Sequence, residues 1–156
     1  MIGIANYRKY WVEMGDRLGD FDVTLFARTE EELARKIKEV EDGALILVAI
    51  VPSSDTIALD LDAISEIETG IIYSLVKVSR NNQDMLDEVN AMEKSQLQIN
   101  RIKKILMWDA THCESEWHQM ISRINFNKMH TDPEYNVYGC DGYSLSFQLF
   151  TPSFNF

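Results

Sequence analysis

The stretch Ala44-Leu45-Ile46-Leu47-Val48-Ala49-Ile50-Val51 is the longest uninterrupted apolar run in the chain, and it is the best candidate for the core strand of the fold. Because these eight residues are apolar at every position and rich in β-branched side chains, they predict a central strand that is covered on both faces. Pro52 closes the strand, since proline offers no backbone N–H. Residues 71–78 are also β-rich and partly alternating, so we expect them to pair with this strand.

Two helices are predicted before the central strand. The first carries one apolar stripe with spacings of three and four, and it ends near Gly15 or Gly19; the stripe is Ile4, Tyr7, Trp11, Met14 and Leu18. Residues 21–27 follow as a linker with strand character.

The second helix begins at a capping box. Thr29 is the expected N-cap and Glu32 is expected to reach back toward it. The inward residues of this helix are Leu33, Ile37 and Val40, and Gly43 offers the left-handed conformation that ends a helix.

The longest periodic segment runs from Asn81 to about Trp108 and predicts a long helix, with Asn81 or Asn82 as its cap. Its expected buried face is broken at Gln96 and consists of Met85, Val89, Met92, Ile99, Ile102 and Leu106. The following residues 109–119 are ambiguous between a loop and a short second helix.

Two more strands are predicted near the carboxyl end, at residues 121–129 and 143–150, the second with strict alternation of apolar and polar residues. Residues that favour turns lie between these two strands, at Asp132-Pro133 and at residues 139–142. We therefore expect one α+β domain over residues 1–156, with a mixed or antiparallel sheet of about four strands.

Composition and charge narrow the function. Twenty-five Asp and Glu against 15 Lys and Arg give a formal charge of −10, which argues against a surface that tracks nucleic-acid phosphates. The apolar runs are too short for a membrane span, and the amino-terminal order of charge and apolar residues is wrong for a secretory signal. Two cysteines suit free thiols in a reducing cytosol, so we expect no secretion, no membrane partner and no sequence-specific nucleic acid.

The stretch His112-Cys113-Glu114-Ser115-Glu116-Trp117-His118 holds the densest group of metal-capable side chains. The chain lacks HExxH, and Cys140 and His130 have no paired spacing, so a polar helix end or loop is the favoured interpretation and no cofactor is expected. A small metal-assisted hydrolase built on His112, Cys113 and His118 stays open as an alternative, as does a Cys–His nucleophilic pair.

Residues 53–68 are acidic and contain no Lys or Arg, so they predict a solvated connection anchored by a few apolar residues. No EF-hand, Walker A or dinucleotide pattern occurs in the chain. This acidic surface and the long helix also fit an intracellular binding or adaptor module.

The order of the expected elements resembles small tail terminator (tail completion) proteins of long-tailed phages and prophages. The resemblance starts at the helix Ile4-Ala5-Asn6-Tyr7-Arg8-Lys9-Tyr10-Trp11, spans nearly the whole chain and ends at the strand Gly142-Tyr143-Ser144-Leu145-Ser146-Phe147-Gln148-Leu149. It implies a ferredoxin-like α+β fold and no enzymatic activity.

The resemblance also implies partners and a location. Members of the family form a ring, usually hexameric, that joins the tail tube to the head connector, so this chain would bind copies of itself and both of those proteins, in the virion or the bacterial cytoplasm. An acidic ring would let DNA slide through its lumen without tight phosphate contacts. The residues expected to make oligomer or partner contacts are Asp55, Asp60, Asp62, Glu66 and Asp141.

Overall fold

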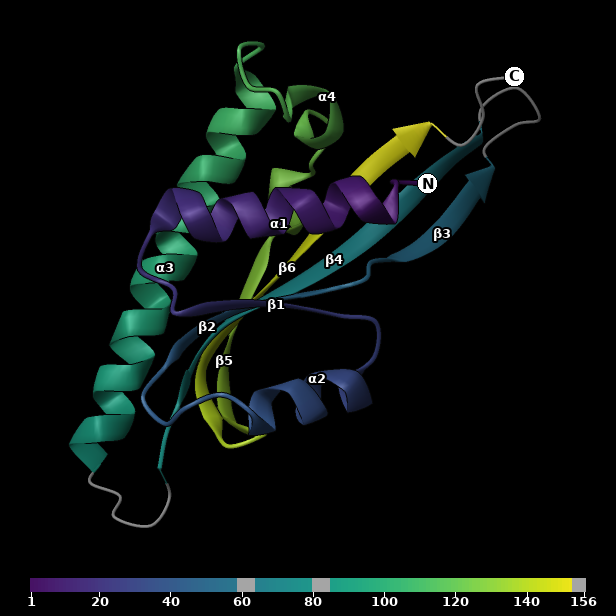
Figure 1. Cartoon of the computed structure of the whole chain (residues 1–156). Helices are drawn as coiled ribbons and strands as arrows, with labels where there is room; N and C mark the ends of the chain where they lie inside the picture. The colour runs from purple at the N-terminus through teal and green to yellow at the C-terminus, as the bar shows by residue number, and fades with distance from the viewer. Residues whose placement is uncertain (59–63, 80–84, 153–156) are drawn as a thin grey trace.

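A computed structural model describes residues 1–58, 64–79 and 85–152 of the chain and contains a six-stranded mixed sheet with helices packed against it (Figure 1). The elements are α1 (Ile4–Leu18), β1 (Val23–Ala27), α2 (Glu30–Lys38), β2 (Leu45–Ile50), β3 (Ser53–Ala58), β4 (Ile64–Lys77), α3 (Met85–Thr111), α4 (His118–Ile121), the 3-10 helix η1 (Phe126–Lys128), β5 (His130–Val137) and β6 (Cys140–Pro152). The α+β class is confirmed. The sheet has six strands instead of about four, and the ferredoxin-like arrangement is not confirmed.

The sheet has the order β1-β2-β4-β6-β5, with β3 attached to β4. Strands β1 and β2 are parallel, and all the other pairs are antiparallel. β2 pairs with the second half of β4 and β3 with its first half, so β2 and β3 lie end to end along one edge of β4. The predicted central strand and its pairing with residues 71–78 are therefore confirmed.

Alternate residues of β2 supply two separate cores. Leu47 and Ala49 face α1 and α3, in a core that also holds Tyr7, Tyr10, Trp11, Met14, Ile72, Ile99, Ile102, Leu106, Leu145, Phe147 and Leu149. Ile46 and Val48 face α2, in a smaller core with Leu33, Ile37, Leu75 and Cys140. The apolar positions of β2 are thus covered on both faces, as the unbroken run predicts.

The helices confirm most of the expected faces. Tyr7, Trp11, Met14 and Leu18 of α1 are buried, but Ile4 is exposed. α3 runs without interruption through Gln96 and buries Ile99, Ile102 and Leu106, whereas Val89 is exposed. In the first half of α3, Ala91 and Ser95 are buried where the prediction places Val89. Asn81 and Asn82 lie outside the described residues.

α2 begins as predicted. The Thr29 hydroxyl accepts a hydrogen bond from the backbone N–H of Glu32 at 3.2 Å. The Glu32 carboxylate reaches back to Arg28, one residue before the cap, where its ion pair with the guanidinium lowers the pKa of Glu32 to about 2. Leu33 and Ile37 are buried. The helix ends at Lys38 with Glu39 as its C-cap, so the prediction that it ends at Gly43 is wrong, although Gly43 has a positive φ of 84° in the chain that follows.

We expect Thr29→Ala to lower the free energy of unfolding by about 1 kcal/mol, because one backbone donor in the first turn of α2 loses its acceptor. Urea unfolding measures the change. Thr29→Ser keeps the hydroxyl and should restore most of the loss; equal stability of Thr29→Ala and the parent protein would contradict the assignment.

The prediction of an acidic connection at residues 53–68 is wrong. Residues 53–58 form β3, and residues 64–68 are the first part of the 14-residue strand β4. Glu66 and Glu68 hide this strand in the sequence, because they are buried in the fold while glutamate is normally a solvent-exposed residue.

The structure also corrects the region before β6. Residues 121–129, predicted as a strand, contain the end of α4, a turn and η1, and only Ile124 bridges to Leu149. Asp132 and Pro133 lie inside β5 and not in a turn. The hairpin turn is formed by Tyr138 and Gly139, which both have positive φ, so the predicted turn at residues 139–142 lies too far along the chain.

Candidate functional site

The ends of β3, β4 and β6 extend past the region covered by α2 (Figure 1); we call this part of the sheet the arm. One edge of the arm is β3, whose six residues are all exposed and which pairs only with β4 within the described chain. The opposite edge is β6, against which residues 123–125 make backbone hydrogen bonds. Among the residues that the structure describes, the free edge of the arm is therefore β3.

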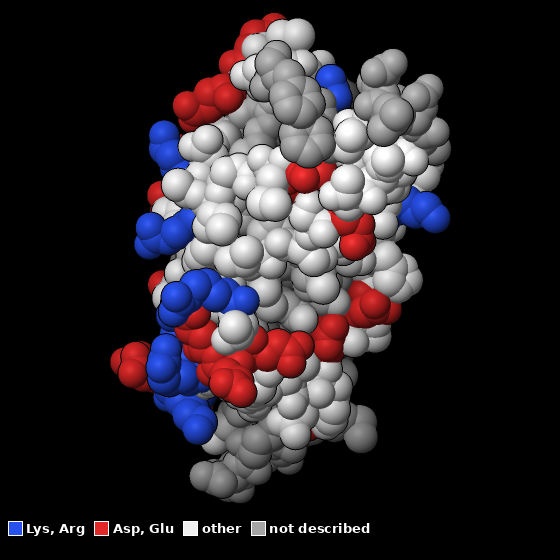
Figure 2. Space-filling model, turned by 90° about the vertical axis from the view of Figure 1, so that its right-hand side faces the viewer, with Lys and Arg blue, Asp and Glu red and all other residues white. Residues whose placement is uncertain are grey.

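The two faces of the arm differ. Ile67 pairs with Asp55 on β3 and with Phe150 on β6, and directly paired residues lie on the same face of a sheet. Side chains two residues apart along a strand also share a face, so Ile57 and Ile71 lie on this face too. On this open face Ile57, Ile71 and Phe150 are 37–38% exposed. Figure 2 views this end of the molecule and shows an extended uncharged area beside a band of charged residues. The arm thus combines a free strand edge with exposed apolar side chains.

The other face of the arm holds the predicted contact residue Glu66. Its carboxylate lies 2.5 Å from the amino group of Met1, and the neighbouring Glu68 is buried and accepts from the backbone N–H of Ile2. These two glutamates therefore fix the start of α1 to the sheet. Asp55 is exposed on β3, whereas Asp60 and Asp62 lie outside the described residues.

Asp141, the last predicted contact residue, is buried in β6 next to the hairpin turn. One of its carboxylate oxygens accepts from the backbone N–H of Asn136 at 2.8 Å. Asn136 has a positive φ and lies where the register of β5 shifts. Asp141 thus stabilises the bulged end of the hairpin from inside the chain.

A second polar centre joins α1 to the end of α3. The fully buried carboxylate of Asp109 accepts from Arg17 at 2.8 and 3.1 Å, from the Tyr10 hydroxyl at 2.8 Å and from the Ser115 hydroxyl at 2.8 Å. Burial opposes ionisation of this carboxyl, but the hydrogen bonds from Arg17, Ser115 and Tyr10 outweigh it and hold the pKa of Asp109 below its ordinary value. Burial and the carboxylate in turn raise the pKa of Tyr10.

The structure brings together two of the three side chains predicted for a metal or nucleophilic site. Cys113 Sγ lies 3.8 Å from His118 Nε2, and His118 Nδ1 lies 3.1 Å from the backbone carbonyl oxygen of Asp109. His112 is directed elsewhere: its ring stacks on Trp108 at 4.7 Å between centroids, and its Nδ1 lies 3.0 Å from the Trp108 carbonyl oxygen. Of the three predicted residues, Cys113 and His118 therefore lie together, and His112 lies apart from them.

Over the described ranges of the chain, no three His, Cys, Asp or Glu side chains gather into a ready-made metal cage. Within the same ranges, no helix combines the length and the apolar character that crossing a bilayer requires.

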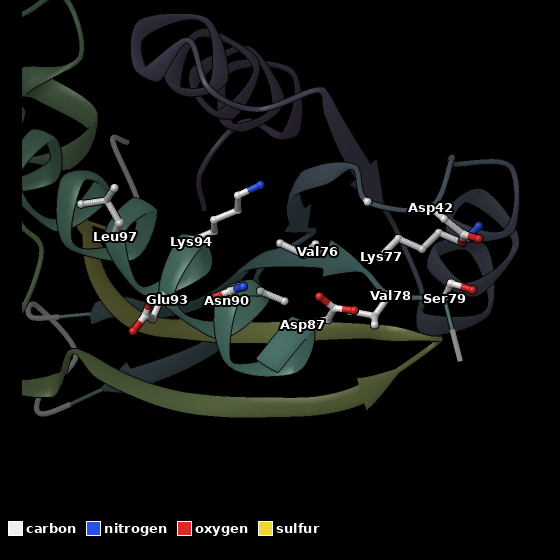
Figure 3. A pocket seen from close by; sticks show the side chains of 12 residues that line it. Asp42, Val76, Lys77, Val78, Ser79, Asp87, Asn90, Glu93, Lys94 and Leu97 are labelled. Atoms are coloured by element: carbon white, nitrogen blue, oxygen red, sulfur yellow. The ribbon is translucent and has the colours of Figure 1, made fainter. Parts of the chain in front are cut away.

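A groove of about 910 Å³ lies between the first half of α3 and the end of β4 (Figure 3). Asp87, Asn90 and Lys94 line its α3 side, and Val76 and Val78 line the strand side. Lys77, at the rim, donates to the carbonyl oxygens of Ile37 and Lys38 and so caps the end of α2. The described lining residues include neither His nor Cys; the ionisable side chains among them are Asp42, Lys77, Asp87, Glu93 and Lys94.

Sequence reasoning missed the Asp109 centre. Tyr10 and Arg17 lie 99 and 92 residues from Asp109 in the chain, so no local pattern connects them. The one available signal is that Asp109 falls in register with the buried face of the long helix, three residues after Leu106.

Comparison with known proteins gave no assignment: no protein-family model matches this chain, and no curated protein does.

Proposed function

We propose that this chain is a non-enzymatic structural protein that assembles with copies of itself through the arm. The observation that carries the proposal is β3, an edge strand whose six residues are all exposed. An edge strand presents unpaired N–H and C=O groups, and proteins commonly block such edges with Lys, Pro or a bulge. Ser53–Ala58 contains neither Lys nor Pro, so it is open to strand addition.

The apolar side chains next to this edge support the same surface. A neighbouring copy that pairs with β3 would also cover Ile57, Ile67 and Phe150 on the open face, and burial of apolar area is the main favourable term in association. Asp55 lies within this surface and is the member of the predicted contact set that is exposed in the described chain.

A tail terminator ring is the specific assembly that we propose. A ring of identical subunits needs two different patches on each subunit in head-to-tail contact, and the arm would supply one of them. The tail tube and the head connector are the further partners in this proposal, and the formal charge of −10 suits a lumen through which DNA slides.

We expect the protein to form a closed oligomer in which Ile57→Lys raises the dissociation constant at least about tenfold, because an ammonium group would be desolvated at the contact. Light scattering across a concentration series measures the mass. Val89→Lys is the matched control, since Val89 is 47% exposed on α3, outside the arm. We expect this control to assemble as the parent protein does.

Two outcomes would overturn the proposal: a protein that stays at its monomer mass of 18.0 kDa at all concentrations, or an oligomer that Ile57→Lys leaves intact. Electron microscopy with purified tail-tube protein tests the specific form, in which rings are expected at tube ends. A strictly monomeric protein that captures one other partner would instead favour the adaptor module.

A further inference from the structure

We propose that Cys113 and His118 form a binding site for a borderline-soft divalent metal ion such as Zn²⁺. The site lies at the corner between α3 and α4, apart from the arm, and the inference does not rest on the assembly function. The thiolate of Cys113 and Nε2 of His118 are the two protein ligands.

The separation of the two donor atoms fits one shared ion. Zn–S and Zn–N bonds of about 2.3 and 2.05 Å at a tetrahedral angle place sulfur and nitrogen roughly 3.6 Å apart. Cys113 Sγ and His118 Nε2 are 3.8 Å apart. An ion can therefore bridge them after a movement of a few tenths of an ångström, and Cys113 is exposed, so the ion has access.

The histidine is already oriented for a metal. Its Nδ1 lies 3.1 Å from the carbonyl oxygen of Asp109. A carbonyl oxygen can only accept, so Nδ1 carries a proton, and in the neutral imidazole the lone pair of Nε2 faces the Cys113 sulfur. Metal-bound histidines commonly make this second hydrogen bond to a carbonyl or carboxylate, which fixes the tautomer and the ring.

The backbone that holds both ligands is itself fixed. Asp109 is anchored through its side chain to Arg17 and Ser115. Backbone hydrogen bonds from Ser115 to His112 and from His118 to Ser115, each 3.1 Å long, close the turn between the two ligands. Little conformational freedom remains to be lost when an ion binds.

The donor types select the class of ion. A thiolate with an imidazole suits Zn²⁺ and Co²⁺ and disfavours Mg²⁺ and Ca²⁺, which prefer oxygen ligands. On binding, the Cys113 thiol gives its proton to the buffer and the sulfur–metal bond forms, with no change in oxidation state. Water molecules complete the coordination, because His112 is held against Trp108.

Titration of the full chain, free of any affinity tag, with Co²⁺ tests the site. We expect a thiolate-to-cobalt charge-transfer absorption that saturates at one ion per chain and that Zn²⁺ abolishes by displacement. Cys113→Ser should remove this absorption, and His118→Gln should weaken binding at least about tenfold. His112→Gln, in the same turn, is the matched control and should bind as the parent protein does.

Thermal unfolding gives a second readout that does not depend on colour. Zn²⁺ should raise the melting temperature of the parent protein and of His112→Gln but not of Cys113→Ser, because an ion that binds only the folded state stabilises it. Absence of the charge-transfer absorption, or equal affinity in the parent, Cys113→Ser and His118→Gln proteins, would overturn the site. Either result leaves the oligomer measurements unaffected.

Discussion

Gly142→Ala is expected to lower the free energy of unfolding by about 3 kcal/mol, at the upper end of what overpacking a core costs. A methyl group at Gly142 would lie 2.0 Å from the backbone carbonyl oxygen of Ser74 and 2.7 Å from the hydroxyl oxygen of Ser95. The nearest atom belongs to the backbone of β4, which pairs with β6 here, so no side-chain rotation relieves the contact. The two strands, or β6 and α3, must move apart.

Urea unfolding measures this loss, and two further variants make it specific. Gly3→Ala is the control, since a methyl group there would meet only the Asn6 side chain at 3.8 Å. Gly3 is the N-cap of α1, a position where alanine is less favourable than glycine, so we expect a loss of up to about 1 kcal/mol, well below that of Gly142→Ala. Ser95→Ala combined with Gly142→Ala should not restore stability, because the Ser74 carbonyl remains in place. Full rescue by Ser95→Ala would assign the clash to the side chain and contradict the argument.

The central strand and the main helices could be predicted because their signals are local. Ala44–Val51 is apolar at every position, and the stripes of α1 and the second half of α3 repeat at helical spacing. The cap at Thr29 needs only four residues of sequence. Each of these features is decided by residues that are close together in the chain.

The arm could not be predicted, because long-range pairing overrides its local pattern. Glu66 and Glu68 look like solvated residues, yet they lie inside β4, where they hold the amino end of α1. β5 is similar: Pro133 and polar neighbours suggest a turn, but antiparallel pairing with the long strand β6 keeps the segment extended. The candidate surface exists only because β3, β4 and β6 lie side by side in the folded chain.

The corner at Cys113 and His118 was predictable in composition but not in geometry. The sequence shows three candidate ligands within seven residues, and the stacking of His112 on Trp108 decides which two face each other. The orientation of His118 depends on Asp109, whose own position depends on α1 at the other end of the chain.

Asp109→Asn is expected to lower the free energy of unfolding by about 2 to 3 kcal/mol at neutral pH. The amide keeps the shape of the carboxylate but removes its charge, and it places a donor among the donors of Arg17, Tyr10 and Ser115. Breaking a fully buried pair costs about 3 to 5 kcal/mol. We reduce that figure because the Arg17 side chain is 33% exposed and water partly solvates the unpaired guanidinium.

The same variant should change how stability depends on pH. The folded protein holds the pKa of Asp109 below 3.8, the value expected when the chain is unfolded. Above that pH both states are ionised and the full stabilisation is present. As the pH falls below 3.8, Asp109 becomes protonated in the unfolded chain but stays ionised in the folded protein. The stabilisation therefore decreases with falling pH, and it is fully lost once Asp109 is protonated in the folded protein as well.

The gap in stability between the parent protein and Asp109→Asn should therefore stay constant from pH 7 down to about pH 4.5 and narrow as the pH falls further toward 3, because the amide has no proton to gain. Unfolding in urea at a series of pH values measures this gap, with Asp16→Asn, an exposed position on α1 next to Arg17, as the matched control. For that control we expect a gap near zero at every pH. A gap for Asp109→Asn that stays constant down to pH 3 would mean that the carboxylate acts only through its shape, and the ionic role of the Arg17 contact would have to be abandoned.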